Sequence, residues 1–479
     1  MAIRPFPIIT DGIVGDVPTN WFPAADSEKG TVLHGCMGLK SVCALTDCTE
    51  VRGLYAWGGV LYAVAQRGGQ SVLWRIDTVS GNPSEVGTIT TSANGPLWFT
   101  NNYKQMMISD GVTGYVYTLA TGLFQPITDS NFPGSAAIGY QDTLGLVVQP
   151  NSIYWFFSNP LDLMTYDSLN SYPKEGSTDN IVGLLTDGVT VTIGGALTTE
   201  FWQNTGGSNV SAATATFKQI PGGLIQYGWA GPKAGCIFDN SPAWVTDKGQ
   251  ILRTPSYGPQ IIPNDMFARA LHGEGDNPGY PTYADVSVFS YVDRDHTFLQ
   301  MNFPTGNETW VLDAKTNLLH KRSSLNDDGI SYGRHRANCY ALFNNKHYVG
   351  DYSNGTIYEM SPKYYDDDGR VFPSIIYSKE VDAGQQDVFF APVEVRFKQG
   401  VGLVSGQGSD PQAMLEKSND GGQSWKSIGW RSMGKIGERK KRCLWLRQGS
   451  DKRRQYRLTI TDPVERQIQA VDWGTPWLS

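Results

Sequence analysis

The chain has 479 residues and a net charge of −7, with 12% aromatic residues, 18% charged residues, 54 Gly and 26 Pro. Aromatic residues favour strands, and Gly and Pro favour turns, so this composition predicts many short strands and excludes a protein dominated by long exposed helices. No apolar run approaches the length of about 18 residues that a membrane-spanning helix needs, and the sequence therefore predicts no membrane span.

Residues 1–51 differ from the rest of the chain. The stretch “DVPTNWFPAADSEKG” at residues 16–30 shows little alternation of apolar and polar residues and contains several turn formers. The first residues also lack the apolar region of a secretory signal. We therefore expect an extended N-terminal arm over residues 1–51 that lies on other surfaces.

Residues 52–365 repeat one pattern, in which an alternating apolar run meets a turn rich in Gly, Asn or Asp and a second such run follows. The clearest unit is “RGLYAWGGVLYAVAQ”, with Gly58 and Gly59 at its turn. Comparable units begin at Trp98, Ala136, Asp179, Ala234, Val286 and Arg336. Their spacing suits four-stranded blades and predicts a β-propeller, with seven blades favoured and six possible.

Residues 366–479 contain longer alternating strands in separate hairpins, such as “APVEVRFKQG” and “RQYRLTITDP”. This pattern is typical of two packed antiparallel sheets. The prediction for the whole chain is therefore an all-β fold with an extended N-terminal arm, a β-propeller and a C-terminal β-sandwich-like domain. That last domain is expected to carry an Asp-box hairpin and a basic hairpin.

The Asp-box hairpin raises the question of sugar cleavage. The stretch “SNDGGQSWKSIGW” fits the pattern S-x-D-x-G-x-x-W of sialidases, with Ser418, Asp420, Gly422 and Trp425 in register. Sialidases also need arginines that clamp the substrate carboxylate, and most Asp-box enzymes repeat the box in several blades. Here the box occurs once, outside the propeller pattern. We interpret it as structural: Asp420 ties the turn, Gly422 can take a positive φ and Trp425 packs beneath.

Other patterns for catalysis or metal binding do not occur in the sequence. H-E-x-x-H, G-x-S-x-G and the phosphate-binding G-x-x-x-x-G-K-[ST] are absent, and the six histidines lack metal-ligand spacing. The six cysteines contain no CxxC, which favours free thiols over zinc ligands or disulfides. We therefore predict a protein that is not an enzyme and that has no catalytic residues, cofactor or metal.

Positive charge is concentrated near the C-terminus. Residues 431–457 contain eleven Lys and Arg against two Asp and Glu, a balance of +9, which leaves −16 for the rest of the chain. The strands “RCLWLRQ” and “RQYRLTI” in this segment are expected to pair as a basic hairpin with the turn “GSDKRR”. The candidate subunit or DNA contacts are Arg439, Lys440, Lys441, Arg442, Lys452, Arg453 and Arg454.

Three interpretations of this basic segment stay open. It can be a solvated edge whose charges resist strand pairing with other molecules. It can contact an acidic neighbour, including a second copy, because the rest of the chain is acidic. It can also contact nucleic-acid phosphates without sequence specificity, since no recognition helix or RNA-binding motif is present.

Two stretches resemble the phage P22-type packaged-DNA stabilisation proteins, also described as tail accessory or nozzle proteins of short-tailed phages. Residues 19–39, “TNWFPAADSEKGTVLHGCMGL”, are similar to the family's Asn-aromatic-Pro element followed by Gly-Leu. Residues 418–464 have a similar order of Asp-Gly turn, Gly-x-x-Gly approach, basic residues, Trp strand and a strand ending in Asp-Pro. “GCMGL” departs from the family's Pro before Gly-Leu, so that turn is expected to differ.

The resemblance implies a structural protein of the virion tail, made in the bacterial host cytoplasm. Six copies would form a ring below the portal and adaptor that continues the DNA channel and retains packaged double-stranded DNA without reading its sequence. The ring would also dock tail fibres, spikes or a plug.

The Asp box and the abundant tryptophans leave an alternative from a different class. This is a propeller glycosidase, or a glycan-binding module, that acts on host surface polysaccharide. Trp202, Trp229 and Trp244 could stack on sugars in such a protein, although burial in blade cores is the favoured prediction for each.

Overall fold

The computed structural model describes residues 17–26, 30–92, 94–207, 215–275, 278–473 and 476–478. Within these residues the chain is built almost entirely of strands, with a single α-helix, α1 (Asp265–His272), and a short 3-10 turn, η2 (Pro255–Tyr257). The chain divides into two compact units. The larger contains residues 41–307 and 336–359, and the smaller contains residues up to 40, 308–335 and 360–479.

The larger unit consists of antiparallel sheets whose strands follow one another along the chain. The first two sheets are β4 (Glu50–Trp57), β5 (Val60–Arg67), β6 (Gln70–Ile76) and β7 (Pro83–Ile89), then β8 (Trp98–Asn101), β9 (Gln105–Ser109), β10 (Gly114–Thr118) and β11 (Leu123–Pro126). The next two are β12 (Ala137–Gln141), β13 (Leu144–Val148), β14 (Tyr154–Ser158) and β15 (Tyr166–Pro173), then β16 (Ile181–Thr186), β17 (Thr190–Gly195), β18 (Thr199–Asn204) and β19 (Phe217–Ile225).

The remaining sheets of this unit follow the same plan. The fifth is β20 (Gly235–Phe238), β21 (Ser241–Val245), β22 (Ile251–Arg253) and β23 (Gln260–Ile262), and the sixth begins with β24 (Ser287–Asp293) and β25 (His296–Phe303). The seventh is β29 (Ala337–Phe343), β30 (Lys346–Asp351), β31 (Thr356–Ser361) and β3 (Gly38–Ala44). A strand from the expected N-terminal arm therefore completes the last sheet.

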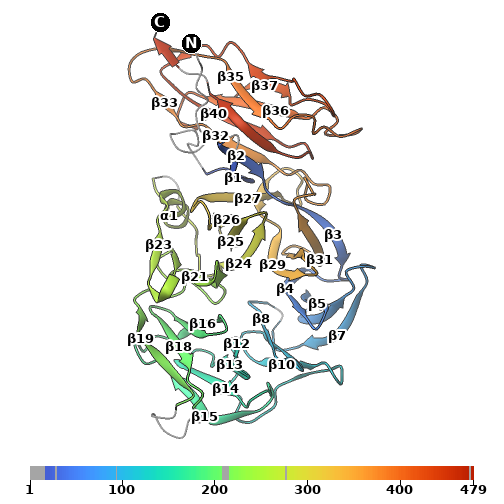
Figure 1. The fold of residues 1–479 in the computed structure, drawn as a ribbon, viewed down its shortest axis with the longest axis vertical. Helices are drawn as coiled ribbons and strands as arrows, with labels where there is room; N and C mark the ends of the chain where they lie inside the picture. The colour runs from blue at the N-terminus through green and yellow to red at the C-terminus, as the bar shows by residue number, and fades with distance from the viewer. Residues whose placement is uncertain are drawn as a thin grey trace. The chain divides into compact units, whose positions relative to one another are not determined.

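The first strands of these sheets form a closed ring. The strands β4, β8, β12, β16, β20, β24 and β29 each contact the next in chain order, and β29 contacts β4. Most of them are labelled around the centre of the larger unit in Figure 1. This arrangement is a propeller, and the described residues contain seven blades, so the prediction of seven repeated units is confirmed.

Local sequence explains how the blades turn and pack. In four blades the hairpin between the first two strands has two residues with positive φ, namely Gly58 and Gly59, Asp142 and Thr143, Asp239 and Asn240, and Asn344 and Asn345. This conformation matches strand twist and is tolerated best by Gly, Asn and Asp. Close packing between blades is clearest at Gly194, where an added Cβ would lie 2.2 Å from the Trp229 ring.

The smaller unit contains two packed sheets. One sheet has the strands β1 (Trp21–Asp26), β2 (Gly30–Gly35), β41 (Gln467–Asp472), β35 (Val393–Phe397) and β38 (Cys443–Trp445). The other has β32 (Ser374–Tyr377), β40 (Arg453–Ile460), β36 (Gln412–Ser418) and β37 (Lys426–Ser432), with β33 (Val381–Asp382) also on β40. Three further strands, β39 (Ser450–Asp451), β34 (Val388–Phe390) and β42 (Pro476–Leu478), pair together. The unit also contains the antiparallel strands β26 (Glu308–Asp313), β27 (Leu319–Leu325) and β28 (Tyr332–Arg334).

One apolar core lies between the two main sheets of this unit. Trp21, Val395 and Trp445 come from one sheet, and Leu415 and Leu458 come from the other. All five side chains are buried in the same cluster. Two antiparallel sheets that share a core in this way form a β-sandwich, which confirms the predicted C-terminal domain type.

Asn20 fixes the N-terminal segment within the smaller unit. Its side-chain amide donates to the carbonyls of Ser323, at 2.9 Å, and Pro373, at 2.6 Å. Its carbonyl oxygen accepts from the Ser323 N–H at 3.1 Å. The residue is fully buried and has φ 58°. Asn tolerates this left-handed backbone and supplies both donors and an acceptor, which accounts for its place before the strand β1.

We predict that Asn20→Ala lowers the free energy of unfolding of the smaller unit by about 3 kcal/mol, because buried polar groups lose their partners. Asn317→Ala is the matched control, because Asn317 has φ 55° but is exposed. The control should cost only the backbone strain, about 1 kcal/mol. Denaturant unfolding followed by tryptophan fluorescence measures both values. Equal losses in the two variants would show that the amide hydrogen bonds contribute nothing.

Candidate functional site

The basic segment is not a hairpin, and that prediction is wrong. The strand β38 pairs with β35, with Trp445 opposite Val393. The strand β40 pairs with β36, with Tyr456 opposite Lys417. The two strands therefore belong to the two facing sheets of the sandwich. Two strands of a hairpin and two strands of facing sheets show the same alternation of apolar residues, because in both arrangements the apolar side chains point into one core.

The first four candidate cations lie in the link between β37 and β38, and only some of them are free. Arg442 forms a two-fold ion pair with Glu394, with Nη2–Oε2 at 2.7 Å and Nε–Oε1 at 3.1 Å. This hydrogen bonding lowers the pKa of Glu394. Lys441 Nζ lies 3.8 Å from Glu438. Arg439 and Lys440 are exposed and form no ion pair with any residue that the structure describes.

The second group of candidates, at the start of β40, divides in a similar way. Arg454 is 1% exposed and is part of the core of the smaller unit. Its guanidinium donates to the Gln448 carbonyl at 2.7 Å and lies 4.1 Å from the centre of the Phe390 ring. Arg453 pairs with Glu380 at 2.6 Å, and Lys452 is exposed. Arg454 is therefore unavailable for a DNA or subunit contact.

We predict that Arg454→Met destabilises the smaller unit by about 2 kcal/mol, since buried acceptors lose a charged donor. Lys452→Gln, two positions away and exposed, should change stability by no more than about 0.5 kcal/mol. Thermal unfolding of the two variants tests this difference. An Arg454→Met protein as stable as the parent would contradict the assignment of Arg454 to the core.

The Asp box forms the tight turn between β36 and β37. Asp420 Oδ1 accepts from the Ser418 hydroxyl at 2.6 Å and from the Ser424 N–H at 2.9 Å. These hydrogen bonds hold the pKa of Asp420 well below its usual value. Gly422 has φ 89°, and Trp425 packs edge-on against Tyr377 and under the Arg457 guanidinium. The Asp420 hydrogen bonds therefore hold the turn, and Trp425 packs the hairpin against β32 and β40.

The three tryptophans considered as sugar platforms lie inside the larger unit. Trp202, Trp229 and Trp244 are 2%, 3% and 0% exposed. Trp229 and Trp244 stack on each other with ring centres 5.8 Å apart. A buried ring cannot stack on a sugar without opening the core, so these residues do not support a glycan site.

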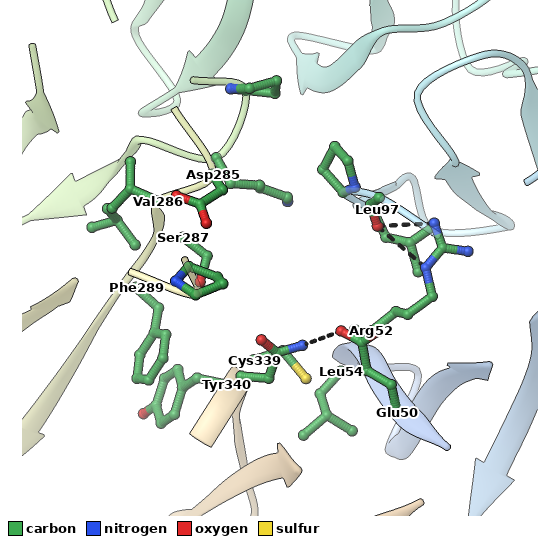
Figure 2. Close-up of a pocket in the computed structure, with 18 of the residues that line it drawn as sticks. Glu50, Arg52, Leu54, Leu97, Asp285, Val286, Ser287, Phe289, Cys339 and Tyr340 are labelled. Carbon is green, nitrogen blue, oxygen red and sulfur yellow. Dashed lines mark hydrogen bonds between the residues drawn. The ribbon is translucent and has the colours of Figure 1, made fainter. Parts of the chain in front are cut away.

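A cavity of about 450 Å³ lies in the larger unit, at the ends of the sheets where several inner strands begin. Figure 2 shows Glu50, Asp285, Phe289, Cys339 and Tyr340 around it. These residues come from β4, β24 with the residues before it, and β29. Residues 95–97, before β8, and residues 232–233, before β20, complete the wall. No single blade contains all the lining residues, so the cavity forms only when the seven blades close into the propeller.

Most charged side chains of the cavity form hydrogen bonds with nearby residues of the protein. Arg52 donates to the carbonyls of Asn94 and Gly95, and Glu50 accepts from the Asn338 amide at 2.8 Å. Asp285 Oδ2 accepts from Thr305 through its N–H at 2.7 Å and its hydroxyl at 2.6 Å.

Lys233 is the exception among the charged groups of the cavity. Its Nζ lies 4.7 Å from the centre of the Trp98 ring, and surrounding protein lowers the pKa of Lys233 to about 7. Lys233 and Asp285 were not predicted from the sequence, because they carry no motif and line one cavity only when the blades form a ring.

The described residues also bear on metal sites, disulfides and membrane-spanning helices. No group of three His, Cys, Asp or Glu side chains there is placed to hold a metal ion. The six cysteines are free thiols. Among the described residues, no helix has the length and apolarity to cross a membrane.

The fold defines an all-β protein made of a propeller and a C-terminal sandwich. The chain matches the family models of the bacteriophage P22 Gp10 β-propeller, over residues 15–365, and the bacteriophage P22 Gp10 β-sandwich, over residues 375–473. It therefore belongs to the bacteriophage P22 Gp10 family of phage tail proteins. The resemblance based on residues 19–39 and 418–464 is confirmed.

The solved structures named below share little sequence with this chain. No curated protein matches the chain. The extracellular domain of the putative hybrid two component system BT4673 from B. thetaiotaomicron is 9% identical, with a TM-score of 0.44, and the match covers 76% of this chain and 43% of that one. The chain thus spans less than half the length of that domain. The N-terminal domain of Nup159 is 8% identical, with a TM-score of 0.45 and coverages of 74% and 99%. Kluyveromyces lactis Hsv2 is 10% identical, with a TM-score of 0.35 and coverages of 67% and 97%.

Proposed function

We propose that the protein is a tail nozzle of a short-tailed phage, in which six copies form a ring below the portal and adaptor. The ring continues the DNA channel, retains packaged double-stranded DNA and docks fibres, spikes or a plug. Membership of the P22 Gp10 family is the observation that carries this proposal. The protein acts in the virion tail after synthesis in the host cytoplasm, and it acts by assembly instead of catalysis.

The charge distribution supports passage of DNA past the protein without tight binding. The chain outside residues 431–457 has a balance of −16, and acidic surfaces repel phosphates. A protein that retains DNA and later releases it needs few phosphate contacts, because each contact adds affinity that release must overcome. The proposed ring therefore retains DNA by closing a path, with a net positive charge only in residues 431–457.

Arg439 and Lys440 are the strongest candidates for contact with an acidic neighbour or with DNA. Both are exposed and carry charges that no described acid balances. Arg442, by contrast, already pairs with Glu394, and contact with a partner would have to compete with that pair. An unpaired cation can bind an anion without first breaking an existing ion pair, so binding costs less free energy. The link between β37 and β38 therefore suits a salt-sensitive contact.

We predict that replacing both Arg439 and Lys440 with Gln leaves the fold intact but lowers affinity for the portal–adaptor complex, or for DNA, by at least about tenfold. The control replaces Lys104 and Lys346, which are exposed lysines of the larger unit, with Gln. Binding at two salt concentrations and the DNA content of assembled virions measure the effect. Normal DNA content, infectivity and affinity in the Arg439 and Lys440 variant would sink the proposed contact.

A further inference from the structure

The cavity of the larger unit is lined by Lys233, whose ammonium forms no ion pair or hydrogen bond with the described residues. Lys233 Nζ has no carboxylate oxygen within 4.0 Å among the described residues. Its ammonium lies over the face of the Trp98 ring. Lys233 is only partly exposed, and a lysine in such a site without a counter-charge has an unfavourable free energy that an anion in the cavity would reduce.

The other titratable groups of the cavity are hydrogen-bonded to the wall or neutral, although Oδ1 of Asp285 is buried without a hydrogen-bond partner among the described residues. Arg52, Glu50 and Asp285 bind wall residues, as described above. Burial raises the pKa of both Cys339 and Tyr340 to about 12, so both are uncharged near neutral pH. The Tyr340 hydroxyl also lies 2.9 Å from His347 Nδ1. Lys233 is thus the cation of the cavity whose charge is available to a ligand.

The remaining wall is largely apolar. Its side chains include Leu54, Leu97, Pro232, Val286 and Phe289. Ligand pockets in proteins span roughly 300–1,000 Å³, are mainly apolar and hold a few placed polar groups. The cavity has this character, with a volume of about 450 Å³. Two carboxylates in the same wall oppose anions of higher charge, because repulsion grows with ligand charge.

We propose that the cavity binds a small monoanionic carboxylate with an apolar body, and that the carboxylate pairs with Lys233. The carboxylate belongs either to a free organic acid or to an acidic side chain of a partner protein, since both present the same group. A charge-assisted hydrogen bond to the ammonium holds the head of the ligand, and the apolar wall holds its body.

Binding depends on pH in a defined direction. The carboxylate pairs with the protonated form of Lys233, and a bound anion raises the pKa of that amine toward its usual value. The protonated fraction of the free protein falls as pH rises through about 7. Affinity should therefore drop about tenfold between pH 6 and pH 8, with proton uptake on binding in that range.

Isothermal titration calorimetry with 3-phenylpropanoate tests the proposal on the full-length protein. We expect binding that is lost in Lys233→Met and kept in Lys248→Met. Lys248 is the matched control, because it also lies over an aromatic ring, 4.6 Å from the centre of Tyr227, but does not line the cavity. Lys233→Arg should bind without the pH dependence, because arginine stays charged at both pH values.

Two further ligands separate the possible outcomes. The neutral 3-phenylpropanamide should bind at least about tenfold more weakly, because it lacks the charge-assisted bond. A blocked glutamyl-phenylalanine dipeptide that binds more tightly than the free acid would indicate a partner side chain, and the reverse order would indicate a small molecule. Equal affinity of the amide and the acid, equal affinity of the parent and Lys233→Met, or no binding of either acid would overturn the proposal. None of these results depends on ring assembly, so the tail function is tested separately.

Discussion

The structure depends on residues 17–26 and 30–44 near the N-terminus, which supply strands to the sandwich and to the last blade. Two strands of this segment, β1 and β2, extend one sheet of the sandwich through the pairing of β2 with β41. Its third strand, β3, completes the last blade. Asn20 fixes the segment through buried hydrogen bonds to Ser323 and Pro373. Without this segment β41 and β31 would be edge strands, and unpaired edges invite aggregation.

Sequence patterns predicted the elements that rest on local chemistry. The seven units were predictable, because each repeats alternating strands around a turn that favours Gly, Asn or Asp, as at Gly58 and Asn344. Strand partners depend on distant segments and were not predictable in the same way. The segments around Trp445 and Tyr456 alternate apolar and polar residues as the strands of a hairpin would. Yet β38 pairs with β35 and β40 pairs with β36, in different sheets. The place of β3 in the last blade has the same cause, since its partners lie some 300 residues further along the chain.

The candidate site shows the same limit at the level of single side chains. Seven basic residues carry the same formal charge in the sequence, but Arg454 supports the core while Arg439 and Lys440 face solvent. Burial and acid partners make this difference, and neither can be read from spacing. Lys233 had no sequence signal either, because its environment arises from blades that meet only when the ring closes. The concentration of charge thus located the basic segment in the sequence. Which of its cations are exposed and unpaired could be identified only from the structure.

The central claim is that the chain works as a six-membered ring on the phage tail. Native mass spectrometry of the purified protein, alone and mixed with a portal–adaptor complex, tests it most directly. The account predicts a six-fold mass, or six copies captured by the complex. A chain that stays monomeric and shows no affinity for the complex would contradict the account.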